Sequence, residues 1–362
     1  MFSPDDSAHM ARALQLAERG RYTAHPNPMV GCVLVRDGEV IAEGWHEQAG
    51  QPHAEINALR DAGDRARGAT AYVSLEPCAH HGKTPPCAEA LITAGVSRVI
   101  AATEDPFEAV AGRGLQMLRE AGIDTEVGLM QVEAQALNAG FISRMARGRP
   151  FVRLKIAASL DGATAMKNGE SQWITGPEAR RDVQNLRAGS GAIMTGIGTV
   201  LADDPSLNVR DVDTGGRQPL RVVLDSRLRM PGKARMLTLD GATLVCCTPG
   251  HGGDGLKETS AEVQEFGAHG DVVNVFEVLA SLAEREINDV LVEAGPRLAG
   301  YLLEKELADE LVIYQSPHIM GSNTRGMFAT PAWETLADRN ALDIRDVRRV
   351  GNDPRITARI SG

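Results

Sequence analysis

The feature that most constrains this chain is a set of metal-binding residue types that lie far apart in the sequence. His53 opens the segment His53-Ala54-Glu55, and the cysteines Cys78 and Cys87 follow much later. One imidazole and two thiolates suit zinc, and three protein ligands leave the fourth tetrahedral position open for water. A fold that uses all three residues must therefore bring separate segments to one point.

Glu55 is the candidate catalytic residue, because it carries a carboxylate and lies close to His53 in the sequence. Zinc activates water at neutral pH, and a neighbouring carboxylate can carry a proton from that water to a leaving group. The pattern resembles the signature of zinc deaminases, which act on nucleobase-like rings. Two other interpretations stay open. Either His80 or His81 closes the fourth position to give a structural zinc site, or no metal binds.

The spacing of the two cysteines carries a more specific resemblance. Two residues usually separate such a pair, whereas this chain has the longer string P-C-A-H-H-G-K-T-P-P-C. This string resembles the deaminase half of the bifunctional deaminase/reductase family of riboflavin biosynthesis. The resemblance implies that the base, ribose and phosphate of the substrate contact Asn27, His46, His80 and Lys83. An amide suits a pyrimidine edge and lysine suits phosphate, but Asn27 could be a turn residue and Lys83 a solvated charge.

Length and composition limit the class of protein. A chain of 362 residues predicts roughly two domains. The formal charge of −10 comes without a basic stripe, so we expect no nucleic-acid partner. The N-terminus lacks the features of a signal peptide and no stretch reaches the length of a membrane span, so we expect a cytoplasmic protein without a membrane partner. The expected partners are a small phosphorylated pyrimidine and, in a homo-oligomer, further copies of the chain.

Three cysteines are not needed for zinc. Cys32, Cys246 and Cys247 lie in or at the end of apolar runs and are predicted to be buried thiols without a reactive role. A disulfide framework is not expected in a chain this long with so few cysteines.

The first half of the chain alternates between strand and helix patterns. A first helix is expected to begin at Asp5 or Asp6 and to end at Gly20, and Asp37-Gly38 predicts a hairpin turn into a strand that ends near Trp45. Further strands are expected at residues 29–36, 71–75, 98–102 and 123–127, and helices at residues 53–62, 87–95, 112–121 and 131–139. This alternation predicts an α/β fold with helices on both faces of a sheet. The resemblance specifies a cytidine-deaminase-like three-layer α/β/α domain.

A domain boundary is predicted at the basic string R-M-A-R-G-R-P, residues 144–150, which ends in glycine and proline. The expected domains are residues 1–146, a zinc-dependent pyrimidine deaminase, and residues 147–362, an NADPH-dependent reductase. After the boundary we expect strands at residues 151–158, 192–195 and 289–293 and a helix at residues 177–188. The glycines at 196 and 198 do not complete a dinucleotide fingerprint, because Leu201 occupies the last position. The turn after residue 293 is a better anion-binding candidate, although a plain strand-to-helix turn looks similar.

The strings A-A-S-L-D-G, S-Q-W-I-T, L-A-D-D-P and V-E-A-G-P-R-L-A-G resemble the reductase half of the same family. That half is similar to the dihydrofolate reductase fold, an α/β fold that binds NADPH without a Rossmann fingerprint. The resemblance assigns the following residues to the cofactor: Ala157, Trp173, Thr199, Asp203, Ser226, Gly295, Pro296, Arg297, Leu298, Ala299, Gly300 and Tyr301. The residues assigned to the phosphorylated substrate are Ser171, Arg187, Leu207, Arg210 and Glu293, and Lys155 joins them by its place on a strand.

Several of these assignments have simpler alternatives. Arg187 and Arg210 could be surface charges, and Trp173 could belong to the core. Lys155 and Asp203 are both candidates for the proton donor in reduction. The preference for NADPH over NADH rests on the resemblance, with Arg297 offering a partner for the extra phosphate.

The expected function is therefore bifunctional. Zinc-dependent hydrolytic deamination of a diaminohydroxyphosphoribosylaminopyrimidine is followed by NADPH-dependent reduction of the ribosyl side chain to ribityl. One alternative is a nucleoside or tRNA deaminase with an appended nucleotide-binding module, and another is a scaffold with structural zinc and regulatory nucleotide binding.

Overall fold

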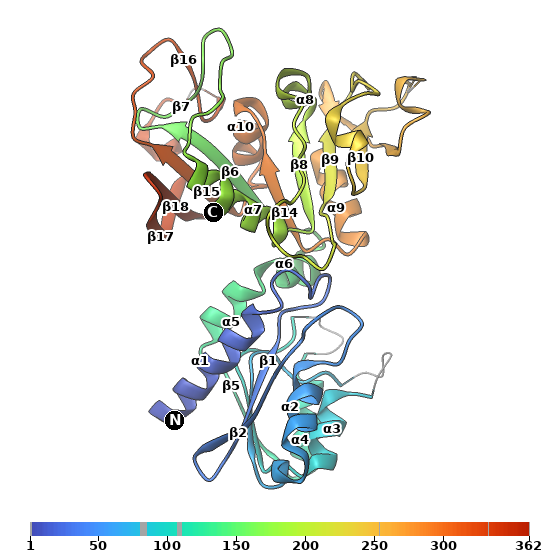
Figure 1. Cartoon of the computed structure of the whole chain (residues 1–362), viewed down its shortest axis with the longest axis vertical. Coiled ribbons are helices and arrows are strands. Elements are labelled where there is room, and N and C mark those ends of the chain that lie inside the picture. The colour runs from blue at the N-terminus through green and yellow to red at the C-terminus, as the bar shows by residue number, and fades with distance from the viewer. Residues whose placement is uncertain (1, 80–84, 107–110, 253, 332, 362) are drawn as a thin grey trace. The chain divides into compact units, whose positions relative to one another are not determined.

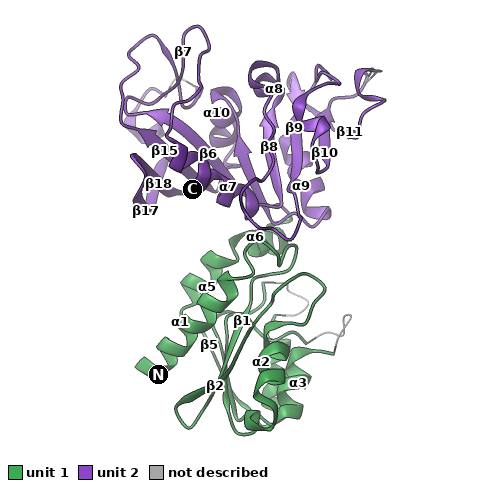
Figure 2. Cartoon of the chain, in the orientation of Figure 1, with its two compact units in different colours: residues 1–148 green, residues 149–362 purple. Residues whose placement is uncertain are grey.

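The structure, a computed structural model, describes residues 2–79, 85–106, 111–252, 254–331 and 333–361. The chain divides into two compact units, Met1–Gly148 and Arg149–Gly362 (Figure 2). The sequence placed the boundary between residues 146 and 147. In the structure that position lies at the end of helix α6 (Ala139–Arg147), which Gly148 terminates in a left-handed conformation with φ 63°. Most of the string interpreted as a boundary segment is therefore helix.

The first unit contains a five-stranded sheet of order β2-β1-β3-β4-β5 (Figure 1). Strand β1 is antiparallel to β2 and β3, whereas β3, β4 and β5 are parallel. The strands are β1 (Gly31–Arg36), β2 (Glu39–Trp45), β3 (Thr70–Val73), β4 (Arg98–Ala101) and β5 (Asp124–Val127). The predicted hairpin turn is present, with positive φ at both Asp37 and Gly38.

Helices cover both faces of this sheet. They are α1 (Pro4–Glu18), α2 (Ala54–Ala62), α3 (Cys87–Ala94), α4 (Arg113–Glu120), α5 (Gln131–Leu137) and α6, with the 3-10 turn η1 (Gly63–Ala66). Apolar side chains of α2, α3 and α4 pack with Leu34 and Val73 on one face. Side chains of α1 and α5 pack with Val33 and Ile100 on the other. Because successive strand residues point to opposite faces, the apolar run of β1 serves both cores, and the unit is the expected three-layer α/β/α domain.

The N-cap of helix α1 lies two or three residues before the predicted cap at Asp5 or Asp6. Ser3 is the N-cap, and its hydroxyl accepts a hydrogen bond from the N–H of Asp6 at 3.0 Å. The Asp6 carboxylate accepts the N–H of Ser3 at 2.7 Å, which completes a capping box. The same carboxylate is buried and also accepts the Tyr72 hydroxyl at 2.7 Å and Arg98 Nη1 at 3.0 Å. Asp6 therefore joins α1 to β3 and β4.

The second unit contains a nine-stranded sheet of order β11-β10-β9-β8-β14-β6-β15-β18-β17. The strands from β11 to β15 are parallel, and β18 and β17 add an antiparallel edge. The strands are β6 (Phe151–Ser159), β8 (Ala192–Gly196), β9 (Leu220–Leu224), β10 (Thr243–Cys247), β11 (Ala261–Glu265), β14 (Asp289–Glu293), β15 (Glu310–Ser316), β17 (Ala341–Val350) and β18 (Asp353–Ser361). Two small sheets pair β7 (Ala163–Met166) with β16 (Thr324–Gly326), and β12 (Ala268–His269) with β13 (Val272–Val273).

Helices also cover both faces of the large sheet. The helical segments are α7 (Pro177–Ala188), α8 (Ile197–Asp203), η2 (Arg235–Thr238), η3 (Asp254–Leu256), α9 (Val275–Glu284), α10 (Pro296–Glu304) and η4 (Leu336–Asp338). Helices α9 and α10 pack on one face, and α7 and α8 pack on the other. The α/β class predicted for both halves is confirmed. Cys246 and Cys247 at the end of β10 are buried in the second unit, and Cys32 in β1 is buried in the first, as expected.

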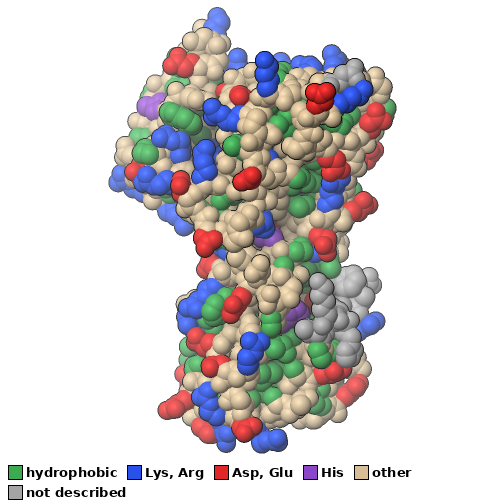
Figure 3. Space-filling model, turned by 45° about the vertical axis from the view of Figure 1, so that its right-hand side comes forward, with side chains coloured by type: hydrophobic (Ala, Val, Ile, Leu, Met, Phe, Trp, Pro, Cys, Tyr) green, Lys and Arg blue, Asp and Glu red, His purple; other side chains and the backbone are tan. Residues whose placement is uncertain are grey.

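The surface carries both signs of charge. Figure 3 shows acidic and basic side chains mixed over the visible face of each unit. In the residues that the structure describes, no helix combines the length and the apolar character needed to span a membrane.

The bonds of Asp6 give the first prediction. Burial raises the pKa of Asp6, but the hydrogen bonds from Ser3 and Tyr72 and the charge of Arg98 outweigh it and lower the pKa to about 2. Because this pKa lies below the ordinary 3.8, the stabilisation is complete above that value and is lost as pH falls through about 2. Asp6→Asn should therefore cost about 1.5–3 kcal/mol in unfolding free energy at pH 7.

Urea unfolding of the first unit at neutral and acid pH measures this change in unfolding free energy. The neighbouring exposed carboxylate supplies the control, since Asp5→Asn should change little. A difference between wild type and Asp6→Asn that stayed constant down to pH 2 would contradict the assignment.

Candidate active site

The three potential zinc ligands come from the starts of two helices and from the segment that follows a strand. His53 is the N-cap of α2, Cys87 is the first residue of α3, and Cys78 lies in the segment after β3. Their ligand atoms all lie within 4.8 Å of one another. His53 Nδ1 is 3.3 Å from Cys87 Sγ and 3.7 Å from Cys78 Sγ. The structure therefore brings together the three residues that the sequence predicts as zinc ligands.

The electrostatics of this group suit a cation. The pKa of Cys78 is lowered to about 4, because Cys87 and His53 hydrogen bond to its sulfur. The backbone N–H of Cys87, at the N-terminus of α3, also donates to Cys78 Sγ at 3.3 Å. One stabilised thiolate, a second sulfur and an imidazole nitrogen fit the donor set of a zinc site with an open fourth position.

Glu55 lies in the first turn of α2 and is 3% exposed. Burial raises the pKa of its carboxyl to about 7. The group can therefore hold or release a proton near neutral pH, as a general acid and base must.

Asn27 and His46 form a pair beside the ligands. Asn27 Nδ2 lies 3.0 Å from His46 Nε2, and His46 Nδ1 lies 3.2 Å from the carbonyl oxygen of Pro52. Burial lowers the pKa of His46, so its neutral ring donates from Nδ1 to Pro52 and accepts from Asn27 at Nε2. The rings of His46 and His53 meet edge to face at 5.4 Å. His80 and Lys83 lie outside the described residues.

Two supporting residues had no role in the sequence interpretation. The Asn138 side chain accepts the N–H of Met29 and donates to its carbonyl oxygen, each at 2.8 Å, and so fixes the segment that carries Asn27. No local pattern marks Asn138, because its partner is 109 residues away. Glu76 is buried and accepts backbone N–H groups of distant residues. Its place in the string Glu76-Pro77-Cys78, beside a predicted zinc ligand, was the sequence signal that could have identified it.

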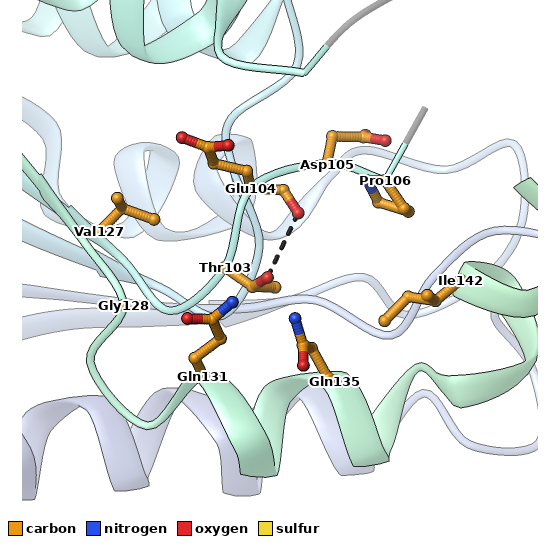
Figure 4. Close-up of a pocket in the computed structure, with 9 residues that line it drawn as sticks. All are labelled: Thr103, Glu104, Asp105, Pro106, Val127, Gly128, Gln131, Gln135 and Ile142. Carbon is orange, nitrogen blue, oxygen red and sulfur yellow. Dashed lines mark hydrogen bonds between the residues drawn. The ribbon is translucent and has the colours of Figure 1, made fainter. Parts of the chain in front are cut away.

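A cavity of about 460 Å³ lies in the first unit, where β4 and β5 end beside α5 and α6 (Figure 4). Its lining is mostly polar, and Gln131 and Gln135 point towards Thr103. The lining residues are Thr103, Glu104, Asp105, Pro106, Val127, Gly128, Gln131, Gln135 and Ile142. The cavity is thus lined by other residues than the three zinc ligands.

In the second unit, three residues assigned to the substrate meet at the carboxyl end of β14. Arg187 of α7 holds Glu293 through two bonds, Nε to Oε1 at 2.6 Å and Nη2 to Oε2 at 3.1 Å. Lys155 pairs with Glu293 in the strand register, and its Nζ is 3.8 Å from Oε2. Burial would raise the pKa of Glu293, but Arg187 and Lys155 lower it to about 2. Burial lowers the pKa of Lys155.

The other residues assigned to the substrate differ in exposure. Leu207 is buried and adopts φ 43°, Ser171 is half-buried, and Arg210 is exposed with its N–H bonded to Gln184. Arg187 is not a surface charge, because its side chain is only 12% exposed.

Trp173 does not belong to the core, so that alternative is wrong. It is 70% exposed, and the guanidinium of Arg180 lies 4.7 Å from its ring centre. The sequence could not decide this because a tryptophan beside a helix start fits either setting.

The segments assigned to the cofactor lie around the starts of α8 and α10. Gly295 caps α10 at φ −75°, and a β-carbon there would meet no atom within 4 Å. At Gly196, which caps α8, the nearest atom to such a β-carbon is Leu298 Cδ2 at 3.9 Å. Neither a positive φ nor a close protein neighbour requires glycine at these two positions. The open space at both suits a bound dinucleotide.

The remaining cofactor candidates divide between surface and interior. Arg297 and Asp203 are exposed, whereas Ala157, Thr199, Ser226, Pro296 and Tyr301 are half-buried. Ser226 Oγ accepts the N–H of Val273 at 2.9 Å, and Tyr301 Oη lies 3.4 Å from His269 Nδ1. Ala299 and Gly300 are buried, with Ala299 in the core and Gly300 packed against the backbone of Ala329, so both face the protein.

Two family comparisons cover most of the chain. Residues 3–103 match the family described as the cytidine and deoxycytidylate deaminase zinc-binding region. Residues 150–354 match the RibD C-terminal domain.

Full-length relatives share this order. The chain is 51% identical to the riboflavin biosynthesis protein RibD of Escherichia coli over 368 residues, covering 96% of this chain and 97% of that protein. It is 47% identical to RibD of Haemophilus influenzae over 377 residues, covering 98% of each.

Two solved structures are similar over 99% of both chains. Acinetobacter baumannii RibD, form 1, has a TM-score of 0.92 at 45% identity. The diaminohydroxyphosphoribosylaminopyrimidine deaminase/5-amino-6-(5-phosphoribosylamino)uracil reductase of Thermotoga maritima has a TM-score of 0.87 at 33% identity.

The ligand geometry predicts that the chain binds zinc and that His53→Ala or Cys78→Ala loses tight binding. Loss of a ligand should weaken binding by more than the about 10–100-fold that loss of an outer-shell partner costs. Zinc released to a coloured chelator measures this. Cys246→Ala, which removes a buried thiol of the second unit, should keep zinc. Wild-type zinc retention in the Cys78 variant would contradict the assignment.

Proposed function

The chain belongs to the family of the bifunctional riboflavin biosynthesis protein RibD, and from this membership we propose how its residues divide the two activities. It is a deaminase and reductase of riboflavin biosynthesis that uses zinc and NADPH and acts on small phosphorylated pyrimidines. The observation that carries the assignment is the convergence of His53, Cys78 and Cys87 beside the buried Glu55. A nucleoside or tRNA deaminase with an appended module is not favoured, because the second half matches the RibD C-terminal domain.

We assign zinc binding to His53, Cys78 and Cys87, and proton transfer to Glu55. Zinc, when bound, supplies a Lewis acid that makes water acidic enough to attack at neutral pH. Glu55 takes a proton from the attacking water as its oxygen bonds to the ring carbon. Glu55 then gives the proton to the exocyclic nitrogen, the carbon–nitrogen bond breaks, and ammonia leaves. Its buried position and a pKa raised to about 7 support both roles.

Asn27, His46, His80 and Lys83 are the proposed contacts of the deaminase substrate. The bond to neutral His46 uses one N–H of the Asn27 amide. The Asn27 oxygen and its second N–H then present an acceptor and a donor to a pyrimidine edge. Lys83 is the proposed contact of the phosphate, for which a lysine point charge suffices.

In the second unit we propose that Lys155, Arg187 and Glu293 bind the substrate sugar, together with Ser171, Leu207 and Arg210. NADPH supplies the hydride that converts the ribosyl group to ribityl. Glu293 stays ionised because two cations pair with it, so it can accept hydrogen bonds from ribose hydroxyls. Of the two candidate proton donors we favour Lys155, whose ammonium is buried beside Glu293 and has a lowered pKa, over the exposed Asp203.

NADPH is the proposed ligand of the segments that open α8 and α10 and of Ala157, Trp173 and Ser226. The open space at Gly196 and Gly295 supports this placement. Backbone N–H groups at the start of α10 would face the dinucleotide phosphates, and the exposed Arg297 would face the additional phosphate.

We also propose that the chain forms a homo-oligomer through β17. This edge strand is exposed from Ala341 to Arg349. Leu342, Ile344 and Val347 lie opposite Ile360, Ala358 and Ile356 in the register, so they continue the apolar face of β18. Ile344 and Val347 remain 60% and 61% exposed. A long exposed edge strand with an apolar face invites pairing with another strand, and a twofold contact between two copies would cover it.

A cytoplasmic location is the remaining proposal. All five cysteines are free thiols, which suits a reducing compartment.

The order of the two activities gives the main functional prediction. Incubation with zinc and diaminohydroxyphosphoribosylaminopyrimidine should release ammonia, and NADPH added afterwards should then be oxidised, as followed by its absorbance. Glu55→Gln should lower ammonia release by about 10²–10⁴-fold, because it removes the proton carrier. It should keep zinc and still oxidise NADPH when the deaminated pyrimidine is supplied.

The exposed carboxylate of Glu39 provides a matched control, and Glu39→Gln should deaminate normally. Full ammonia release by Glu55→Gln would refute the role of Glu55. Ammonia release without NADPH oxidation would refute the reductase assignment.

The edge-strand proposal predicts that Ile344→Glu shifts the protein to monomer, because a charge would enter the apolar contact. Light scattering after size-exclusion chromatography measures the mass. Val132→Glu is the control, since Val132 is 71% exposed on α5 and lies outside the strand. A wild-type monomer, or an unchanged mass in Ile344→Glu, would contradict the proposal.

A further inference from the structure

Glu76 is a buried carboxylate that lies next to the zinc ligands without belonging to them. It is 4% exposed. Its Oε2 accepts the N–H groups of Asp105 at 3.1 Å and Gly112 at 2.9 Å, and its Oε1 accepts those of Gly114 at 2.9 Å and Leu115 at 3.3 Å. In the part of the chain that the structure describes, its hydrogen-bond partners are therefore backbone groups rather than a cation. A buried carboxylate with this many N–H donors is held in one orientation.

Three of the donors belong to the start of α4. Gly112 is the N-cap of this eight-residue helix, and Gly114 and Leu115 lie in its first turn. The first N–H groups of a helix have no partner within the helix and carry a partial positive charge. Glu76, which comes from the segment after β3, supplies the missing acceptor.

The contact between α4 and this segment is too close for a side chain. A β-carbon at Gly114 would lie 1.9 Å from the carbonyl oxygen of Pro77, the residue between Glu76 and Cys78. Glycine at 114 is thus required by the approach of the Pro77 backbone. The carboxylate of Glu76 and the backbone of Pro77 thus both contact Gly114 of α4.

The main chain of Glu76 is held on its other side. Its N–H donates to the carbonyl oxygen of Thr103 at 2.9 Å, beyond the end of β4. Immediately after it, the Cys78 carbonyl accepts the N–H of Ala88 at 3.2 Å, and Cys78 Sγ accepts the N–H of Cys87 at 3.3 Å. Cys78 is therefore placed by two anchors, Glu76 on α4 and the start of α3.

We propose that Glu76 is a positioning residue for Cys78, which holds its sulfur at the distance that zinc binding by His53 and Cys87 requires. This inference rests on the proposed zinc site of the deaminase. Loss of an outer-shell partner typically weakens metal binding by about 10–100-fold, and we expect that range for Glu76 variants.

The test measures the metal site directly rather than activity alone. Glu76→Gln keeps one carbonyl oxygen but turns an NH₂ group towards N–H donors, and Glu76→Ala removes both acceptors. Zinc affinity by chelator competition should fall by about 10–100-fold. The visible bands of the cobalt-substituted protein, which report ligand geometry, should shift. The reductase activity of the same chain should stay at the wild-type level.

Glu120→Gln is the matched control. Glu120 is an exposed carboxylate at the other end of α4, and its loss should leave zinc affinity and the cobalt spectrum unchanged. Gly114→Ala tests the same anchor from the side of α4, because the added β-carbon would lie 1.9 Å from the Pro77 carbonyl oxygen and 3.3 Å from Glu76 Oε1. It should also weaken zinc binding.

The outcomes separate the explanations. Unchanged zinc affinity and cobalt spectrum in folded Glu76→Gln and Glu76→Ala would overturn the proposal and leave Glu76 a role in stability alone. If Glu76→Ala unfolds the first unit by circular dichroism, the near-isosteric Glu76→Gln decides. If the wild type binds zinc tightly but releases no ammonia, the proposed deamination fails while the positioning role stands.

Discussion

The geometry of both sites depends on where strands end and helices begin. In an α/β layer the carboxyl ends of parallel strands and the N-termini of the following helices lie on the same edge of the sheet. His53 and Cys87 open helices, and Cys78 follows β3, so ligands from distant segments meet at one edge. The second unit repeats the arrangement, since Glu293 ends β14 and Gly295 opens α10. Helix N-termini add partial positive charge there, which stabilises the thiolate of Cys78 in one unit and suits dinucleotide phosphates in the other.

Two buried carboxylates show how the surroundings of a group decide its chemistry. Glu293 is paired with Arg187 and Lys155, and its pKa falls to about 2, so it is always charged and serves to orient its neighbours. Glu55 is more deeply buried, at 3% exposed, and there burial dominates and its pKa rises to about 7. The same side chain therefore acts as a fixed anion in one unit and as a proton carrier in the other. Strand register contributes to the low pKa of Glu293, because it places Lys155 directly beside Glu293.

Much of the fold and the metal site could be predicted from local sequence. Strand and helix patterns identified the principal elements of the first unit but only β6, β8, β14 and α7 of the second. Asp37-Gly38 identified its hairpin, and residue chemistry selected His53, Cys78 and Cys87. Local sequence was ambiguous where one pattern fits two structures. The basic string at residues 144–150 was predicted as a domain boundary, and the two units divide within it, but its first four residues form the last turn of α6, which runs to Arg147. Trp173 fitted core and surface equally well until its 70% exposure was known.

The residues that sequence could not assign share one property: each acts on the backbone of a distant segment. The Asn138 side chain pairs with both backbone groups of Met29, and Glu76 accepts four N–H groups from other loops and from α4. Such bonds leave no periodic trace, because the donor group is the same in every residue. These bonds nevertheless determine where Asn27 and Cys78 lie. Loops that carry functional residues lack the regular backbone hydrogen bonds of helices and sheets and need other contacts to fix their position. A reader of sequence can find the residues that perform chemistry from their types, but finding those that position them requires the fold.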